Sequence, residues 1–439
     1  MTGSAPMTRG VSRITPIQWL ICLVAAMGFA FDIYEILMMP LIVRPLLLDL
    51  GGLTVGTPRF NLWAGLLIYL PAMAAGIFGL LGGYLADLLG RRRALVWSLL
   101  LYTVSAAAAG FSTSLTQFVV WRCLTFVGVA VEYVAALAWV AELFDDPTRR
   151  ESALGYTQAA GGVGGLMVTG AYYLIVTYAP HLPAILGAHQ PWRYMLISGL
   201  VPALPLLIVR PWLPDSAVWR ASTSRPSFRS LFSTKLRKTT WLTMVMVGFT
   251  YAMAYGALQQ VPRIVAGLPA MTSVSAVVRE QTVSGIQLFQ EFGHVAGRVC
   301  FALIAALVAR QRRLLRLFQM PAIAAFVLLF FISAIHAPQL LKVAVFAASF
   351  FTVGQLSFWG NYLPRVYPTR IRATGESFAT NVGGRTIGTF ATIVTAQWAN
   401  IAPGATPAIQ LAYASGGVAI IACLAGLIAS AWLPEESFL

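Results

Sequence analysis

The chain has 439 residues, of which 58% are apolar and only 10% are charged, and its mean hydropathy is +0.75. Water-soluble domains carry charge on about 25% of their residues, and a single soluble core stops growing near about 250–300 residues. The composition therefore excludes one large soluble domain. A formal net charge of +15 would suggest nucleic acid as the partner of a soluble protein, but we expect no such partner for a chain of this composition.

Long apolar runs dominate the chain. A helix needs about 20 apolar residues to span the hydrocarbon core of a bilayer, and twelve runs of about that length lie between charged or turn residues. The pattern predicts an all-α polytopic membrane protein with twelve transmembrane helices. The predicted spans are residues 17–42, 61–84, 94–111, 117–142, 156–178, 194–210, 240–266, 282–309, 317–335, 341–363, 375–396 and 410–432.

Basic residues gather in alternate loops between these spans. If the N-terminus is cytoplasmic, 21 of the 30 lysines and arginines fall in cytoplasmic segments. Cytoplasmic loops of membrane proteins carry this excess of basic residues, so we expect both termini in the cytoplasm and the chain in the inner (plasma) membrane. Loops facing anionic lipid headgroups also account for the net positive charge.

The chain is also internally doubled. A basic cluster after the second span recurs after the eighth, a Pro-Thr-Arg string after the fourth recurs after the tenth, and Leu-Pro before an acid recurs after the sixth and the twelfth. The offsets all lie between 219 and 221 residues. We expect a six-helix bundle at 1–210, a basic cytoplasmic linker at 211–239 and a second six-helix bundle at 240–439. A duplicated bundle of this kind places its substrate between the halves near the middle of the membrane.

One motif follows the second span. The string Gly83-Tyr84-Leu85-Ala86-Asp87-Leu88-Leu89-Gly90-Arg91-Arg92-Arg93 resembles the signature of the major facilitator superfamily between helices 2 and 3. The resemblance implies the superfamily fold and a cytoplasmic gate, whose expected residues are Gly83, Asp87, Gly90, Arg91 and Arg92.

Two further strings narrow the resemblance. Residues 122–133, from Arg122 to Glu132-Tyr133, are similar to a helix-4 motif of metabolite–proton symporters. Asp32-Ile33-Tyr34-Glu35 resembles a helix-1 motif of aromatic-acid and related organic-anion symporters. The resemblance implies transport of a small solute driven by protons.

Three acids lie inside the first half. Asp32 and Glu35 share one face of the first span, and Glu35 lies at a depth similar to that of Arg122 in the fourth span. An acid–arginine pair between these helices is therefore geometrically allowed, and it would serve either proton coupling or static cohesion of the bundle. Glu132 lies deeper in the fourth span, where burial favours a neutral carboxyl group, and is either a second proton carrier or a structural acid.

Arginines stand at the middle of the second half. Glu291, His294 and Arg298 share one face of the eighth span, and Arg385 lies near the middle of the eleventh, behind Asn381. An arginine fork suits a carboxylate, so we expect an anion site here, in which His294 either titrates or is a hydrogen-bonded neighbour. Other residues expected to line it, or alternatively to serve ordinary packing, are Tyr34, Tyr251, Tyr255 and Gln259.

The combined interpretation is a secondary active transporter that couples proton entry to a small organic carboxylate by alternating access. The alternatives are a sugar or neutral-solute carrier of the same fold, and a drug–proton antiporter. The sequence contains no nucleotide-binding loop and no nucleophile-elbow or zincin motif. We therefore expect no enzymatic activity, cofactor or metal. The expected partners are a small-molecule substrate, protons and the lipid bilayer, and we expect a monomer.

Overall fold

The computed structural model describes residues 15–144, 146–214, 228–305, 307–308, 310–368 and 371–435. Residues 215–227 of the predicted linker lie outside the described residues, as do Thr369 and Arg370 of the repeated Pro-Thr-Arg string. Helices make up nearly all of the described chain, in agreement with the predicted fold class. The first half contains α1 (Pro16–Asp49), α2 (Pro58–Leu89), α3 (Arg91–Gly110), α4 (Leu115–Glu142), α5 (Pro147–Ala159), α6 (Gly161–Tyr178), α7 (Pro191–Ser198) and α8 (Leu200–Val209).

The second half follows the same plan with more irregular helices. Its second, fourth and last predicted spans are continuous over α12, α14 and α17, whereas the other three spans contain the π-helical segments η4, η7 and η10. The elements are α10 (Arg237–Tyr251), η4 (Ala252–Ala257), η5 (Leu258–Gln260), α11 (Val261–Ala266), α12 (Ala276–Ala305), α13 (Gln311–Val327), η7 (Leu328–Ser333), α14 (Leu341–Val366), α15 (Arg372–Phe378), η10 (Ala379–Ile387), η11 (Gly388–Phe390), α16 (Ala391–Trp398) and α17 (Pro407–Ala429).

Within the described residues, ten helical segments are long and apolar enough to cross a membrane. The other two predicted spans correspond to α12, which carries several charged residues, and to the segment from α15 to α16, which is divided by the π-helical η10. Each π-helical turn inserts an extra residue and is frequent at functional sites. The twelve-helix prediction is thus confirmed, and the two spans that deviate from simple hydrophobicity are those with the predicted anion-site residues Glu291, Arg298 and Arg385.

Several predicted boundaries differ from the observed ones. The first span was expected to end at residue 42, but α1 continues to Asp49 because its last turns bury Leu46 and Leu47. The predicted span 156–178 begins as α5 and breaks at Ala160 before α6, and the span 194–210 breaks at Gly199 between α7 and α8. The tenth span is longer than expected, since α14 runs to Val366.

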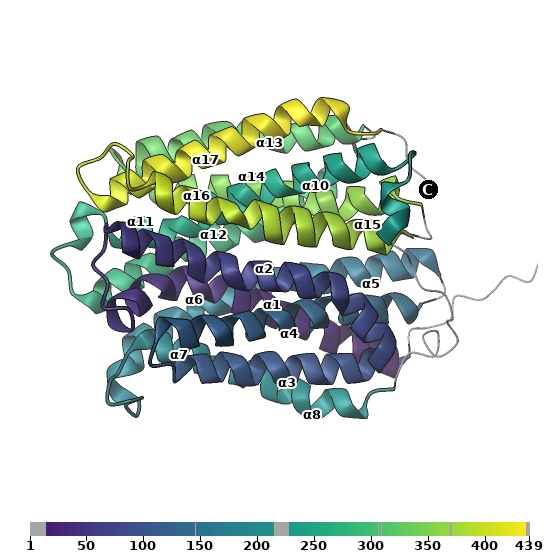
Figure 1. Ribbon diagram of the computed structural model, residues 1–439, viewed down its shortest axis with the longest axis horizontal. Coiled ribbons are helices and arrows are strands. Elements are labelled where there is room, and N and C mark those ends of the chain that lie inside the picture. The colour runs from purple at the N-terminus through teal and green to yellow at the C-terminus, as the bar shows by residue number, and fades with distance from the viewer. Residues whose placement is uncertain are drawn as a thin grey trace, which may run out of the picture.

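The two halves lie side by side as two layers of roughly aligned helices, with the N-terminal half below and the C-terminal half above in Figure 1. Helix α6 packs on α12, and α2 packs on η10 and α16, so these five segments form most of the contact between the halves. We call the end where α17 finishes the terminal end and the opposite end the distal end. Because successive spans alternate in direction, the beginning of α1 and the end of α17 lie at the same end of the protein.

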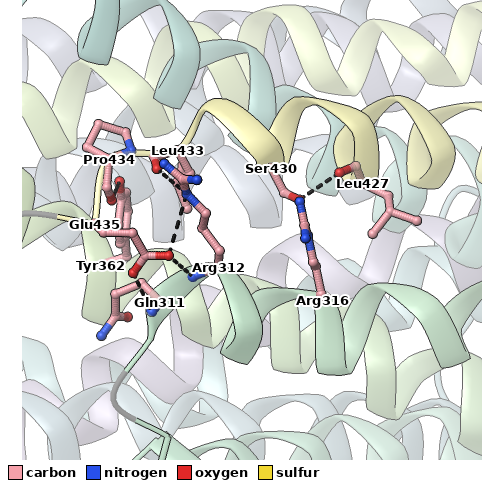
Figure 2. A network of polar contacts seen from close by, with 9 residues as sticks. All are labelled: Gln311, Arg312, Arg316, Tyr362, Leu427, Ser430, Leu433, Pro434 and Glu435. Atoms are coloured by element: carbon pink, nitrogen blue, oxygen red, sulfur yellow. Dashed lines mark hydrogen bonds and ion pairs between the residues drawn. The ribbon is translucent and has the colours of Figure 1, made fainter.

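The repeated strings make equivalent contacts in the two halves. Arg92 donates to the carbonyl oxygen of Pro211 at 3.3 Å, and Arg312, 220 positions later, donates to the carbonyl oxygen of Leu433 at 2.7 Å. In the second half the contact extends to a network in which Glu435 accepts from the backbone of Arg312 and Tyr362 donates to Pro434 (Figure 2). The duplication seen in the sequence therefore corresponds to a repeated tie between the third and sixth helices of each bundle.

Close helix crossings depend on glycine. A Cβ placed on Gly164 of α6 would lie 1.9 Å from the carbonyl oxygen of Ala30 in α1, which is inside van der Waals contact. Small residues let membrane helices approach in this way, because packing rather than hydrophobicity drives their association. Gly170, on the same helix, has no neighbour within 4 Å of such a Cβ.

We predict that Gly164→Ala forces α1 and α6 apart and lowers the free energy of unfolding by about 1–3 kcal/mol. Gly170→Ala is the matched control, and it should leave stability unchanged or raise it, since alanine favours a helix by about 1 kcal/mol over glycine. Thermal unfolding of the purified protein in detergent measures both. Equal melting temperatures for the two variants would contradict the close α1–α6 contact.

Candidate functional site

An ion pair joins α1 and α4 inside the N-terminal bundle. Arg122 donates through Nη1 to Glu35 Oε2 at 3.0 Å and through Nη2 to the backbone carbonyl of Glu35 at 2.9 Å. Both side chains are fully buried, and the guanidinium lies 5.2 Å from the centre of the Phe126 ring. The structure therefore contains the acid–arginine pair between the first and fourth spans that the sequence allowed. Two hydrogen bonds hold the arginine to α1.

A second buried pair lies deeper in the same bundle. Arg210, at the end of the sixth span, donates to Glu132 Oε1 at 2.5 Å, and both side chains are about 1% exposed. Gly28 of α1 makes room for the pair, because a Cβ there would lie 2.2 Å from Arg210 Nη2. Arg210 is the last residue of the predicted span 194–210, and the structure makes it a buried partner of Glu132.

Asp32 lies between these two pairs. It is 2% exposed, and its Oδ1 atom accepts no hydrogen bond from the described residues. Its electrostatic neighbours are Glu132, Arg210, Arg385 and Glu35. The described centre of this bundle thus holds three acids and two arginines. Each arginine forms an ion pair with one acid, Arg122 with Glu35 and Arg210 with Glu132. Asp32 is the surplus acid, and the charged group that faces it from the other half is Arg385.

Arg385 extends from the π-helical η10 toward the N-terminal half. Its Nη1 donates to Asn381 Oδ1 at 3.2 Å, and its guanidinium lies 5.7 Å from the centre of the Tyr133 ring on α4. No carboxylate of the described residues forms an ion pair with it within 4.0 Å. It borders a cavity of about 10 Å³ with residues of α1, α2 and α4 and with Tyr255, and that volume accommodates about one water molecule.

Two tyrosines support Arg385 from its own half. The rings of Tyr251 and Tyr255 stack at 5.5 Å with an interplanar angle of 14°. Gly384, beside Arg385, lies against the Tyr251 ring, where a Cβ would be 2.7 Å from its nearest atom. The glycine pair that precedes Arg385 therefore lets η10 approach the tyrosine helix.

The polar face of α12 forms a second cluster at the contact with α6. Glu291 accepts from Gln287 at 2.8 Å and contacts His294 Nδ1 at 2.9 Å. A Cβ on Gly165 of α6 would lie 2.0 Å from Glu291 Oε2, so the carboxylate touches the other half. Arg298 interacts electrostatically with Glu291 and with Tyr133. The two arginines predicted for the anion site therefore share one neighbour, Tyr133.

Comparison with known proteins identifies the fold family. The family model described as Major Facilitator Superfamily matches residues 19–392. The chain belongs to the major facilitator superfamily.

Relatives within the superfamily are transporters of named compounds. The probable 4-methylmuconolactone transporter of Cupriavidus pinatubonensis is 28% identical over 81% of this chain and 78% of its own length. The 3-(3-hydroxy-phenyl)propionate transporter of Escherichia coli is 25% identical over 71% of this chain and 72% of its own. The crystal structure of a D-xylose-proton symporter covers 95% of this chain and 98% of its own with a TM-score of 0.73, and at 16% identity it shows the fold alone. This superfamily member is a multi-pass membrane transporter of small molecules and not an enzyme.

Two predicted substrate residues lie among neighbours other than Arg385. Tyr34 is buried in the N-terminal bundle, and its hydroxyl is bonded to Ser198 of α7 at 2.5 Å. Its ring points into that bundle rather than toward the second half, so we remove it from the candidate site. Gln259 is buried in η5, where the adjacent Gln260 accepts from Arg263 near the distal end.

The predicted gate is described in part. The surroundings of Gly83 and the side chain of Asp87 lie outside the described residues. Gly90 has a φ of +90°, a conformation that favours glycine, and it starts α3 directly before Arg91. Arg91 forms an ion pair with Glu142 at the end of α4 at 2.8 Å. The described part of the motif thus ties α3 to α4 at the terminal end.

The sequence did not single out Arg210 or Tyr133 as site residues. Arg210 stands next to Pro211 at the edge of an apolar run, where a basic residue is usually interfacial. Tyr133 was visible as the last residue of the helix-4 motif. A signal for it exists, because Tyr133 directly follows an intramembrane acid in the helix-4 motif.

The difference between Glu35, which is paired, and Asp32, which has no ion pair in the described chain, yields a prediction about the stability of the protein. Glu35→Gln leaves Arg122 buried without a counter-charge and should lower the free energy of unfolding by about 3–5 kcal/mol. Asp32→Asn removes the surplus buried carboxylate and should leave the melting temperature unchanged or raise it. Thermal unfolding of both purified variants at neutral pH measures the contrast. Equal losses of stability would mean that Asp32 is itself a structural partner.

Proposed function

We propose that this transporter carries a small organic carboxylate together with a proton. The observation that supports this most directly is Arg385, a guanidinium at the contact between the halves with a neutral hydrogen-bond partner and three nearby tyrosines. A charged group inside a membrane is expensive unless it is paired or functional. A substrate carboxylate would supply the missing partner, and the tyrosines would provide an aromatic wall.

Asp32 supplies the proposed coupling. When this carboxylate is charged, it attracts Arg385 across the interface and competes with a substrate for the same guanidinium. Protonation removes that competition, so the proton and the substrate carboxylate bind together. The two paired acids, Glu35 and Glu132, then hold their arginines in place. Proton exchange at either of them would first require an ion pair to open.

Alternating access is proposed to follow from the two-layer architecture. The terminal end would be cytoplasmic, as the distribution of basic residues indicates, and the halves would rock about the central site. Gly90, Arg91, Arg92 and the undescribed Asp87 side chain would then act at the cytoplasmic gate. The volume beside Arg385 is about 10 Å³, so a substrate at this face requires the halves to separate further.

The first functional prediction concerns Arg385. Removing one partner of a buried charge pair typically costs about 2–5 kcal/mol, so Arg385→Gln should weaken carboxylate binding by more than about tenfold. Arg385→Lys should rescue binding in part, because a point charge cannot reproduce the fork. Titration of purified protein with 3-(3-hydroxyphenyl)propionate measures the affinity, and Lys342→Gln, an exposed cation of the same half, is the control.

This experiment also distinguishes a carboxylate carrier from the alternative of a sugar or neutral-solute carrier. If Arg385→Gln leaves the affinity for carboxylates intact while D-xylose binds, the arginine is a packing residue and the carboxylate assignment is wrong. A cationic drug as the bound ligand would favour the antiporter alternative instead.

The second functional prediction concerns coupling. Asp32→Asn should abolish uphill uptake driven by an imposed proton gradient in proteoliposomes and spare counterflow exchange, because the neutral side chain imitates the protonated state. Uptake by the unmodified protein should rise as the outer solution is acidified. Equal loss of uptake and exchange in Asp32→Asn would point to a structural role, and a flat response to external pH would contradict symport.

A further inference from the structure

A second cavity lies between the halves at the distal end, and its lining residues differ from those beside Arg385. Its volume is about 250 Å³. Three arginines border it: Arg44 from α1, Arg263 from α11 and Arg279 from α12. Other lining residues include Phe60 and Asn61 of α2 and the loop residues Met271 and Thr272.

Arg263 is the most buried of the three arginines, with 7% of its surface exposed. It donates to Gln260 Oε1 and Asn61 Oδ1, each at 2.9 Å, and lies 5.5 Å from the centre of the Phe60 ring. No carboxylate of the described chain pairs with it, and its Nε has no acceptor there. A buried guanidinium with neutral partners is costly, so this position favours an anion.

The other two arginines leave a net positive charge. Arg44 forms an ion pair with Glu280 at 3.3 Å, and Tyr172 also donates to that carboxylate at 3.0 Å. Arg279 is half-buried and donates to the backbone carbonyls of Met271 and Val274. One carboxylate therefore balances one of three arginines, and the cavity carries two uncompensated positive charges within apolar walls.

We propose that this distal cavity is a second anion site, which binds a small carboxylate from the aqueous phase on Arg263 and Arg279. The cavity is large enough for a small aromatic or aliphatic acid and is distinct from the space beside Arg385. The assignment stands independently of the central site, since it rests on different residues and on the distal cavity alone.

The site has a conformational consequence. Asn61 and Arg44 belong to the first half, whereas Arg263 and Arg279 belong to the second, so a bound anion contacts both. A ligand that binds best when two surfaces are together stabilises that arrangement by linkage. Occupancy of the distal cavity therefore favours the conformation in which the distal end is closed.

Cysteine labelling of detergent-solubilised protein tests the site. The four natural cysteines, at 22, 123, 300 and 423, are first replaced by serine or alanine. Thr272→Cys places a reporter in the cavity lining, and Ala184→Cys provides a control at an exposed position of another loop. The measured quantity is the rate of modification by anionic 2-sulfonatoethyl methanethiosulfonate divided by the rate with its cationic trimethylammonium counterpart.

At low ionic strength we expect this ratio to be at least about tenfold higher at position 272 than at position 184, because a cavity of one charge sign concentrates its counter-ions. Adding 3-(3-hydroxyphenyl)propionate should slow the anionic reagent at position 272. Both effects should disappear with Arg263→Gln combined with Arg279→Gln, and both should persist with Arg385→Gln.

Equal ratios at the two positions would overturn the proposal, as would protection lost with Arg385→Gln and kept in the double variant. If the double variant does not fold, Arg279→Gln alone, at the half-buried arginine, should still lower the ratio several-fold. A lack of transport activity would leave these outcomes unchanged, so failure of the central-site proposal is recognised separately.

A lipid phosphate could offer the same chemistry, and nanodiscs distinguish the two sources. Protection by the carboxylate should be the same in detergent, in phosphatidylcholine and in phosphatidylcholine with phosphatidylglycerol. If phosphatidylglycerol alone removes the reagent preference, and the carboxylate gives no protection in detergent, the cavity binds a lipid headgroup and the proposal of a soluble ligand is wrong.

Discussion

Burial of charge is the constraint on which the rest of this structure depends. A carboxylate or guanidinium taken out of water is tolerated when a partner of opposite sign offsets the lost hydration. The N-terminal bundle meets this condition twice, with Glu35–Arg122 and Glu132–Arg210. Asp32 and Arg385, which form no ion pair among the described residues, belong to opposite halves and interact electrostatically across the interface. Their mutual attraction links charge balance to the contact between the halves.

Close packing makes those pairs possible. Gly28 leaves the volume that the Glu132–Arg210 pair occupies, and Gly165 leaves the volume that Glu291 occupies at the α6–α12 contact. Gly79 of α2 does the same for Asn381, the residue that accepts from Arg385. In each case the glycine is on a neighbouring helix and not on the helix that carries the charge. Polar groups can therefore sit between helices without separating them.

The sequence predicted the features that follow from one helix at a time. Hydrophobic runs gave the twelve spans, and a rise of about 1.5 Å per residue put Glu35 and Arg122 at similar depths, where the structure pairs them. The sequence could not predict that Arg210 is buried against Glu132 of α4. This contact depends on how the sixth span, which breaks at Gly199, packs against another helix. The inward rotation of Tyr34 and the π-helical turn around Arg385 likewise depend on packing against other helices.

The duplication shows how the contacts at the terminal end of the protein differ from those at its centre. At the terminal end the halves keep equivalent contacts, Arg92 to Pro211 and Arg312 to Leu433. At the centre the equivalents diverge, because the positions 220 residues after Glu132 and Arg210 are Thr352 and Ser430. The second half therefore lacks this ion pair and carries Arg385 at the interface instead. The equivalent hydrogen bonds at the terminal end hold the two bundles in the same shape. The charged residues that differ between the halves place, among the described residues, an unpaired acid, Asp32, in the first half and an unpaired arginine, Arg385, in the second. Under the proposed mechanism, a solute or proton that alters this charge balance would change how strongly the halves attract each other, and rocking of the halves would follow from that change.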